Sequence, residues 1–212
     1  IKMNSAIIVS AGSGSRFASD IPKQFTKLNN KEILCYSVET FLNHPEINEV
    51  IIVCNADWVN HVKKNYPLCQ IIKGGVRRQD SCLNGINSIS KKTKNILIHD
   101  AARPFVSQKI ISDCLSALKA HDACAPIIPS IDSLISWHNN KASHIDRSKI
   151  FSIQTPQCFK KKLIYNILNA NIIDTDEIGL LLKFNPNANV TFVKGSINNR
   201  KITLQEDLKF FS

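Results

Sequence analysis

Short apolar runs rich in β-branched residues recur along the first 130 residues, and segments with helical periodicity separate them. The runs are AIIVS (6–10), VIIVC (50–54), QIIK (70–73), NILIH (95–99) and CAPIIP (124–129), and the helical segments between them cover 33–42, 58–65, 80–89 and 106–120. Continuously apolar strands are typical of sheets buried on both faces, and their alternation with helices favours parallel pairing through right-handed crossovers. The pattern therefore predicts an α/β fold of three layers around a mostly parallel sheet.

The pattern changes after Ser130. Residues 131–151 show two weakly alternating stretches on either side of the turn-prone sequence His138-Asn139-Asn140-Lys141, which predicts a β-hairpin. Such an arm has little to bury against within its own protomer, so we expect a dimerisation element, with an unpartnered surface hairpin as the alternative.

The chain after the arm returns to alternating elements. We expect a helix over 160–170, a second helix over 176–184 capped by Thr175, and a strand over 190–194. Thr203 and Glu206 have the spacing of a capping box, which predicts a C-terminal helix. With 212 residues and no linker, the chain is expected to form one domain over 3–212, with the arm at about 131–151 as its excursion.

Charge and cysteine content narrow the class of protein. A formal net charge of +10 favours anionic partners, which could be nucleic acid, lipid or small phosphorylated substrates. The lysine groups at 63–64, 91–92 and 160–162 are expected to be solvated helix faces, and aromatic residues are not interleaved with them as single-strand binding would require. Seven cysteines without any C-x-x-C pair are typical of reduced thiols. The cysteines therefore favour a cytoplasmic protein, and since no apolar window is long enough for a membrane span, we also expect it to be soluble.

A glycine-containing loop, Ser10-Ala11-Gly12-Ser13-Gly14-Ser15-Arg16, follows the first predicted strand. Phe17 stands where the dinucleotide fingerprint needs a third glycine, and the P-loop string is absent from the sequence. Arg16 and the nearby Lys23 supply two cations, which suit a triphosphate whose charge must be neutralised while a bond to phosphorus forms. An ordinary turn is the alternative for the glycines alone.

Two further segments follow predicted strands in the same way. They are GGVRRQDS (74–81) and HDAARPFV (99–106). Ligands of open parallel sheets bind beyond the carboxyl ends of the strands, so we expect all three segments to meet at one crevice.

Taken together and in order, these motifs resemble one family, the 2-C-methyl-D-erythritol 4-phosphate cytidylyltransferases. The resemblance covers essentially the whole chain and rests on Gly12–Arg16, Pro22–Gln24, Gly74-Gly75 with Arg78 and Ser81, His99–Pro104, Asp146-Arg147, Gln154–Gln157, Thr175–Glu177 and Lys201–Thr203. It implies a Rossmann-like nucleotidyltransferase sandwich whose β-hairpin arm mediates a homodimer. The implied reaction is attack of a sugar-alcohol phosphate on the α-phosphorus of CTP with release of pyrophosphate.

The resemblance also implies roles for single residues. Arg16 and Lys23 match the pair that stabilises the transition state, and Arg147 and Lys201 match the residues that hold the acceptor phosphate, Arg147 acting on the site of the neighbouring protomer. A salt bridge of Arg147 with Asp146 is the alternative. Residues expected to assist with the acceptor are Arg103, Ser133 and Thr175.

The nucleotide side is implied in the same way. Residues matched to the binding of CTP are Ser10, Ala11, Gly12, Gly14, Gly75, Ser81 and Asp100, the last lying near the ribose. Mg²⁺ is expected to be carried mainly by the CTP phosphates and water, with no protein ligand assigned. His99 is expected to be a buried polar neighbour, because a phosphate monoester is already largely dianionic and the reaction needs no proton shuttle.

Some alternatives remain, and the chain departs from the family pattern in places. Asp132-Ser133-Leu134-Ile135 keeps a hydroxyl but lacks the lysine usual at the start of the arm. A ribitol 5-phosphate cytidylyltransferase would share the loop and much of the arm. From other classes, a nicotinamide dehydrogenase lacks its third glycine here, and a nucleic-acid-binding module would use the net charge but not the ordered motifs. We therefore expect neither nucleic acid nor membrane among the partners.

Overall fold

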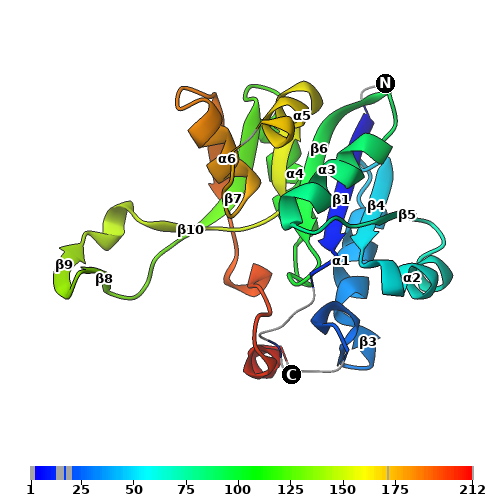
Figure 1. Ribbon diagram of the computed structural model, residues 1–212, viewed down its shortest axis with the longest axis horizontal. Helices are drawn as coiled ribbons and strands as arrows, with labels where there is room; N and C mark the ends of the chain where they lie inside the picture. Colours follow the sequence, from blue (N-terminus) through cyan, green and yellow to red (C-terminus); the bar gives the residue numbers. More distant parts are fainter. Residues whose placement is uncertain (1–2, 13–16, 18–20, 171, 212) are drawn as a thin grey trace.

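The computed structural model describes residues 3–12, 17, 21–170 and 172–211, and its centre is a mostly parallel sheet (Figure 1). Its strands in chain order are β1 (Met3–Ser10), β4 (Glu49–Cys54), β5 (Gln70–Lys73), β6 (Thr93–Asp100), β7 (Ala123–Pro129), β10 (Phe151–Ile153), β11 (Gln157–Lys160) and β12 (Val190–Lys194). The order across the sheet is β10-β7-β11-β6-β1-β4-β5, and β12 pairs with β7. β10 and β11 run antiparallel to their neighbours, whereas β1, β4, β5 and β6 pair in parallel.

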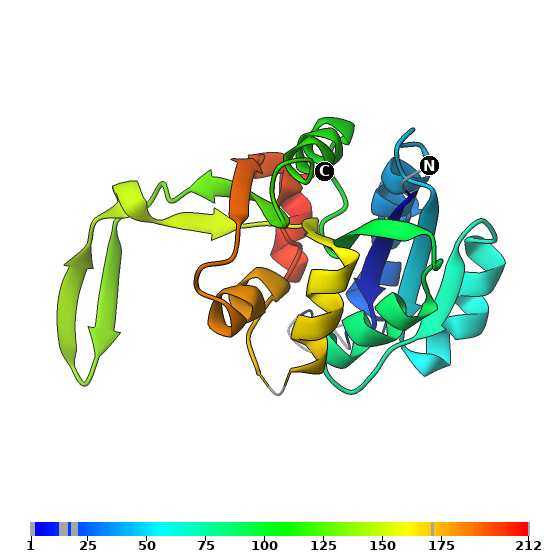
Figure 2. The same cartoon turned by 90° about the horizontal axis from the view of Figure 1, so that it is seen from above.

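Helices cover both faces of the sheet, which gives the expected three layers (Figure 2). The helices are α1 (Ile33–Leu42), α2 (Val59–Asn65), α3 (Arg78–Ser88), α4 (Gln108–Ala117), α5 (Lys161–Asn169) and α6 (Glu177–Phe184). Successive β1 side chains enter opposite cores: Ala6 and Ile8 pack with residues of α1, α2 and α4, and Ile7 packs with residues of α3, α5 and α6. This alternation follows from the pleat of a strand and explains why β1 reads as continuously apolar.

The elements expected from the pattern are present, but two of the helices begin differently from the prediction. Thr175 does not cap α6; the Asp176 side chain does, accepting a hydrogen bond from the Gly179 N–H at 2.7 Å. The predicted C-terminal helix is present as a 3₁₀-helix over Gln205–Phe210. Its start is fixed by the Asp207 carboxylate, which accepts from the N–H groups of Thr203 and Leu204 at 2.7 and 2.9 Å, rather than by a Thr203–Glu206 box.

Four strands were not anticipated. Antiparallel β10 and β11 lie on either side of a cis Thr155-Pro156 bond, within a stretch whose apolar runs are too short to predict as strands. A small ribbon, β2 (Lys27–Leu28) with β3 (Lys31–Glu32), turns through Asn29 and Asn30, both with positive φ. Asparagine tolerates this left-handed region better than other non-glycine residues.

A hairpin of β8 (Leu134–His138) and β9 (Lys141–Ile145) forms a separate sheet that extends away from the body (Figures 1 and 2). Its two-residue turn uses Asn139 and Asn140, with φ of 49° and 59°, the left-handed geometry that tight hairpins prefer. Ile135 and Trp137 are 64% and 65% exposed, so the hairpin packs few apolar side chains against its own protomer. Across the described part of the chain, no helix combines the length and apolarity that a membrane span requires.

Candidate active site

A cleft lies beyond the carboxyl ends of β1 and β6, which are neighbours in the sheet. On one side of β1 the sheet continues with β4 and β5, and on the other side of β1 lies β6. The cleft therefore sits where the strand order reverses. The expectation that the three strand-end segments converge on one crevice is met. Predicted site residues that line it are Ser10, Ala11, Gly12, Lys23, Gly75, Ser81, Asp100 and Lys201.

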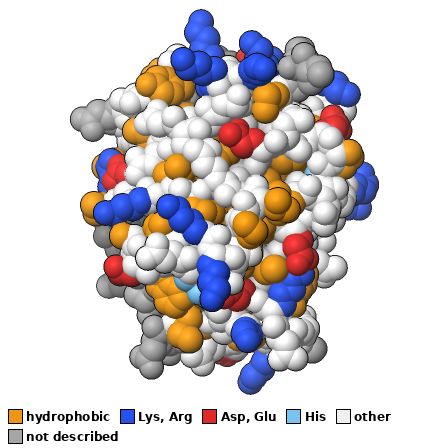
Figure 3. Space-filling model, turned by 90° about the vertical axis from the view of Figure 1, so that its right-hand side faces the viewer, with side chains coloured by type: hydrophobic (Ala, Val, Ile, Leu, Met, Phe, Trp, Pro, Cys, Tyr) orange, Lys and Arg blue, Asp and Glu red, His pale blue; other side chains and the backbone are white. Residues whose placement is uncertain are grey.

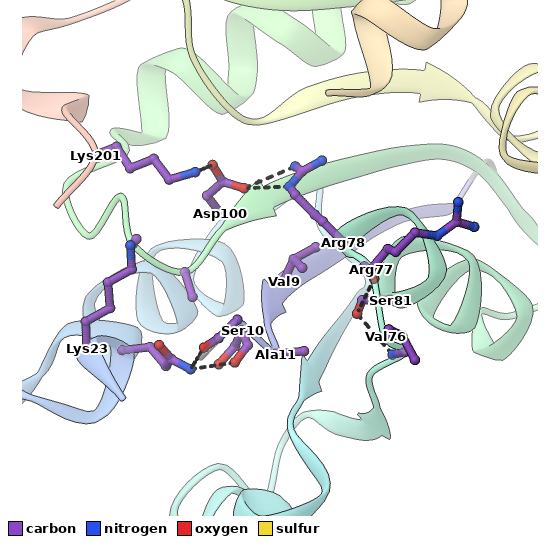
Figure 4. Close-up of a pocket in the computed structure, with 15 residues that line it drawn as sticks. Val9, Ser10, Ala11, Lys23, Val76, Arg77, Arg78, Ser81, Asp100 and Lys201 are labelled. Atoms are coloured by element: carbon purple, nitrogen blue, oxygen red, sulfur yellow. Dashed lines mark hydrogen bonds and ion pairs between the residues drawn. The ribbon is translucent and has the colours of Figure 1, made fainter. Parts of the chain in front are cut away.

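Asp100 is the anion around which the cleft is arranged (Figure 4). Its carboxylate accepts from the Lys201 ammonium at 2.8 Å and from Arg78 Nη2 at 3.1 Å, and Arg103 Nε lies 3.9 Å away. Burial alone would raise the pKa of Asp100, but Arg78, Lys201 and Arg103 outweigh burial and hold that pKa well below its ordinary value. One permanent negative charge thus holds three positive ones at the edge of the cleft, which leaves the region positive and attractive to anions.

Arg78 is itself fixed from behind by a buried carboxylate. Glu177, only 1% exposed, accepts from Arg78 Nη1 at 2.5 Å and from the Cys82 thiol at 3.2 Å. Burial opposes the charge of Arg78, but Glu177 and Asp100 raise its pKa, so the guanidinium stays charged. Arg78 and Glu177 stand in separate sequence motifs, and nothing local signals their contact, because they are the first residues of α3 and α6 and are brought together only by the fold.

Gln24 ties the segment that carries Lys23 to the end of β1. Its side-chain amide donates to the carbonyl oxygens of Ser10 and Gly12 at 2.7 and 3.1 Å, and Gln24 is 3% exposed. This anchor brings Lys23 to the side of the cleft opposite Arg78 (Figure 4). Gln24 belongs to the Pro22–Gln24 motif, but no role was predicted for it from the sequence. Its position next to Lys23 was the feature that could have indicated one.

The glycine pair before α3 allows the loop to lie against β1. A Cβ on Gly74 would be 2.4 Å from the Cβ of Ala11, and one on Gly75 would be 2.4 Å from the Cβ of Asp80. The Gly75 N–H donates to Ser81 Oγ at 3.1 Å, which fixes the hydroxyl at the cleft. Close backbone approach, rather than flexibility, is therefore what requires glycine here.

His99 is buried beneath the cleft, as expected. Its Nε2 lies 3.0 Å from the Arg103 carbonyl oxygen and its Nδ1 lies 3.0 Å from Thr155 Oγ1. Burial lowers the pKa of His99 to about 4, so the ring is neutral near pH 7. Its contacts shape the turn that follows β6.

The remaining predicted residues lie away from the cleft or outside the described chain. Arg16 and Gly14 fall outside the described residues. Arg147 and Ser133 are exposed at the base of the arm, and Arg147 donates to the Ile131 carbonyl oxygen. The alternative salt bridge is replaced by an exposed contact of Asp146 with Lys149 at 3.9 Å.

Two residues assigned to the acceptor differ in their surroundings. Arg103 sits next to the cleft, where its Nη1 donates to the Asn199 carbonyl oxygen at 2.9 Å. Thr175 is exposed, and its hydroxyl donates to Asp174 at 3.1 Å. Arg103 is therefore held near Asp100, whereas Thr175 hydrogen-bonds to Asp174 in the loop before α6.

Possible metal ligands gather elsewhere. Among the described residues, the one group of three with metal-ligand spacing is Cys114, Cys124 and Cys158, whose sulfur atoms lie within 4.8 Å of one another in the core. They come from α4, β7 and β11, so their spacing in the sequence gave no hint of the cluster. At the cleft, Asp100 offers carboxylate oxygens of the kind that Mg²⁺ prefers, but cations already occupy them.

Comparison with known proteins gives one consistent result. The family model described as 2-C-methyl-D-erythritol 4-phosphate cytidylyltransferase matches residues 4–211. The protein of that name from Clostridium novyi (strain NT) is 36% identical over 218 residues, covering 97% of this chain and 93% of the relative. A bifunctional enzyme IspD/IspF from Pelagibacter ubique is 34% identical over 212 residues, covering 98% of this chain and 57% of the relative. The crystal structure of the 4-diphosphocytidyl-2C-methyl-D-erythritol synthase of Anaerococcus prevotii superposes with a TM-score of 0.87 at 28% identity, covering 99% of this chain and 94% of that one.

Proposed function

The chain belongs to the 2-C-methyl-D-erythritol 4-phosphate cytidylyltransferase family, and we infer that it transfers a cytidylyl group from CTP to 2-C-methyl-D-erythritol 4-phosphate. The products are CDP-methylerythritol and pyrophosphate, in the non-mevalonate route to isoprenoids. The ribitol 5-phosphate alternative is not favoured, since the matched relatives carry the methylerythritol name.

The observation that carries this function is the cation-rich cleft around Asp100. Both reactants are anions, and the acceptor phosphate is already largely dianionic, so the protein's task is to bring the two together and stabilise the charge at phosphorus. The neutral His99 faces Thr155 and the Arg103 carbonyl oxygen. Among the described residues of the cleft, the fixed cations around Asp100 suit a reaction that brings two anions together.

We assign the transition-state charge to Lys23 together with Arg16. Support for Lys23 comes from its place in the cleft and from the Gln24 anchor, which limits the positions that its backbone can take. Arg16 rests on the resemblance alone. A preorganised cation lowers the barrier because it does not have to be reoriented as negative charge develops.

Nucleotide and acceptor would occupy different sides of the cleft. The Ser10–Gly12 backbone, Gly75 and Ser81 would contact the cytidine, with Gly14 in the same loop and Asp100 near the ribose. Lys201, whose ammonium is paired with Asp100, would turn to the acceptor phosphate, with Arg103 beside it. Mg²⁺ would arrive on the CTP phosphates and add positive charge at the departing pyrophosphate.

We further propose that the protein acts as a homodimer in the cytoplasm, with the arm reaching a second copy. Arg147, Ser133 and the exposed Trp137 lie on an arm that its own protomer leaves largely uncovered. In a two-fold dimer each arm can serve the other site, so Arg147 of the partner subunit would complete the acceptor phosphate pocket. Thr175, exposed in the loop before α6, would face the same acceptor.

The proposed function is tested by incubating the purified protein with Mg²⁺, CTP and 2-C-methyl-D-erythritol 4-phosphate and measuring pyrophosphate. We expect release that depends on both substrates and is much slower with ribitol 5-phosphate or with ATP. Equal rates with ribitol 5-phosphate would contradict the acceptor, and no release from any sugar phosphate would contradict the reaction.

A further inference from the structure

A second hollow lies at the opposite end of the sheet from the candidate active site. It has a volume of about 1040 Å³ and is bordered by the start of β1 at Asn4, the start of β6 at Thr93 and the end of α4 at Leu118. β1 has eight residues, and a strand rises about 3.3 Å per residue, so this groove lies roughly 20 Å from the cleft. The two are separate sites.

Lysines dominate the rim of this groove. The six that line it are Lys91, Lys94, Lys119, Lys160, Lys161 and Lys162, and Glu46 is the acidic residue among the lining side chains. They come from distant parts of the sequence, and antiparallel pairing of β11 with β6 sets Lys160 opposite Asn95. The expectation of solvated helix faces did not include this convergence, and it was wrong for Lys91 and Lys92, which are exposed in a turn after α3.

The positive charge of the groove is only partly balanced. Lys160 pairs with Asp122 at 2.9 Å, and Lys161 donates to the Ser90 carbonyl oxygen at 3.1 Å. Within the described chain, the other four lysines have no ion pair. Figure 3 shows Lys and Arg side chains gathered along the upper edge of the molecule, the edge where β1 begins in Figure 1. Like charges around one hollow repel one another, and a multivalent anion would relieve that repulsion.

The groove also offers apolar surface. Leu115 of α4 and Leu118, which follows the helix, line it as edges of the core, and Tyr165 from α5 lines it while 47% exposed. A hollow with an apolar lining and a charged rim suits a small molecule of mixed character. Long nucleic acid would instead need phosphate contacts repeated along an extended surface.

We propose that this groove binds a small organic diphosphate, with its phosphates on the lysines and its apolar part against Leu115, Leu118 and Tyr165. Such a ligand matches both the charge and the lining, whereas inorganic phosphate would use the rim alone. The site is distinct from the proposed catalytic cleft and does not depend on the reaction assigned to it.

The test uses octyl diphosphate as the probe and isothermal titration calorimetry of the full chain, with saturating CTP present to occupy the catalytic cleft. The groove variant is Lys91→Gln/Lys94→Gln/Lys162→Gln. A control of equal charge is Lys63→Gln/Lys64→Gln/Lys194→Gln, which changes exposed lysines elsewhere. We expect one octyl diphosphate per chain, an affinity lowered about tenfold or more in the groove variant, and less than about a twofold change in the control.

A second comparison isolates the apolar contact. Tyr165→Ser should weaken octyl diphosphate severalfold and leave inorganic pyrophosphate unchanged. Three results would each overturn the proposal. They are no binding of octyl diphosphate to the wild-type protein, an equal loss of its affinity in both triple variants, and its displacement by single-stranded RNA at a concentration below that of the probe. Thermal unfolding of each variant in the absence of ligand separates a loss of binding from a loss of folding.

Discussion

The cleft and the arm carry arginines in opposite circumstances. Arg78 is held between Asp100 and Glu177, so its charge is fixed before any ligand arrives. Arg147 is exposed at the base of the hairpin and donates to a backbone carbonyl. Within this chain, then, Arg78 is fixed in the cleft by two carboxylates, whereas Arg147 is exposed on the arm and does not line the cleft.

The largest effect is expected from removing a cation of the cleft. Lys23→Ala should lower kcat by about a hundredfold or more, the scale of losing a preorganised charge donor, with Arg16→Ala similar. Pyrophosphate release under saturating substrates measures this loss. The matched control is Lys27→Ala, an exposed lysine four residues further along the chain, which should retain near-normal turnover. Near-normal turnover in Lys23→Ala would remove Lys23 from the transition state.

The cleft should also depend on the carboxylate behind Arg78. Glu177→Gln keeps the size of the side chain but removes the charge that faces the guanidinium, so we expect unfolding to be easier by about 2 kcal/mol. The KM for CTP should rise roughly tenfold, because Arg78 lines the cleft beside the residues assigned to CTP and would lose one of its two carboxylate partners. Chemical denaturation and initial rates measure the two effects.

Glu39→Gln provides the comparison at the surface, where the exposed Glu39 pairs with the half-buried Lys31. Exposed pairs contribute about 0–1 kcal/mol, so both readouts should change little. If Glu177→Gln behaves like Glu39→Gln, then the buried pair does not hold Arg78 for CTP.

Local elements and long-range contacts were predictable from the sequence to different degrees. Strand and helix periods are local, so Ile33–Leu42 and Gln70–Lys73 were predicted with their observed limits. Contacts such as Arg78 with Glu177 join residues 99 positions apart and depend on packing that no local pattern encodes. The cap of α6 was misplaced because Thr175 and Asp176 are both good caps, and the backbone selects Asp176.

The buried ring beneath the cleft should make stability depend on pH. The pKa of His99 is about 4 in the folded protein and about 6.5 when unfolded, so the unfolded chain binds the extra proton between these values. Stability should be full above pH 6.5 and fall as pH drops, by about 2 kcal/mol between pH 7 and 5. Burial also lowers the pKa of His44, which adds a loss in the same direction.

Urea unfolding at pH 7 and pH 5 measures this loss, and His99→Gln should reduce it while His44→Gln leaves most of it. The carboxylates with lowered pKa, such as Asp100, lose their contribution only below about pH 4, outside this window. If the loss of stability between pH 7 and pH 5 is unchanged in His99→Gln, then protonation of His99 does not cause it.

The arm is expected to give the smallest single effect and the sharpest test of assembly. Arg147→Ala should raise the KM for the acceptor about tenfold, because one charged contact with its phosphate is lost, and leave the KM for CTP unchanged. Lys149→Ala, on the same short helix, is the matched control. An unchanged acceptor KM would exclude Arg147 from the phosphate pocket.

Mixing variants then decides which protomer Arg147 serves. In a heterodimer of Lys23→Ala with Arg147→Ala, a crossed arm gives one site that lacks both side chains and one that retains both. Random exchange of subunits should therefore restore about a quarter of wild-type activity at low acceptor concentration, above the mean of the two parents. If each arm serves its own protomer, no site in the mixture has both residues, and the activity stays at that mean.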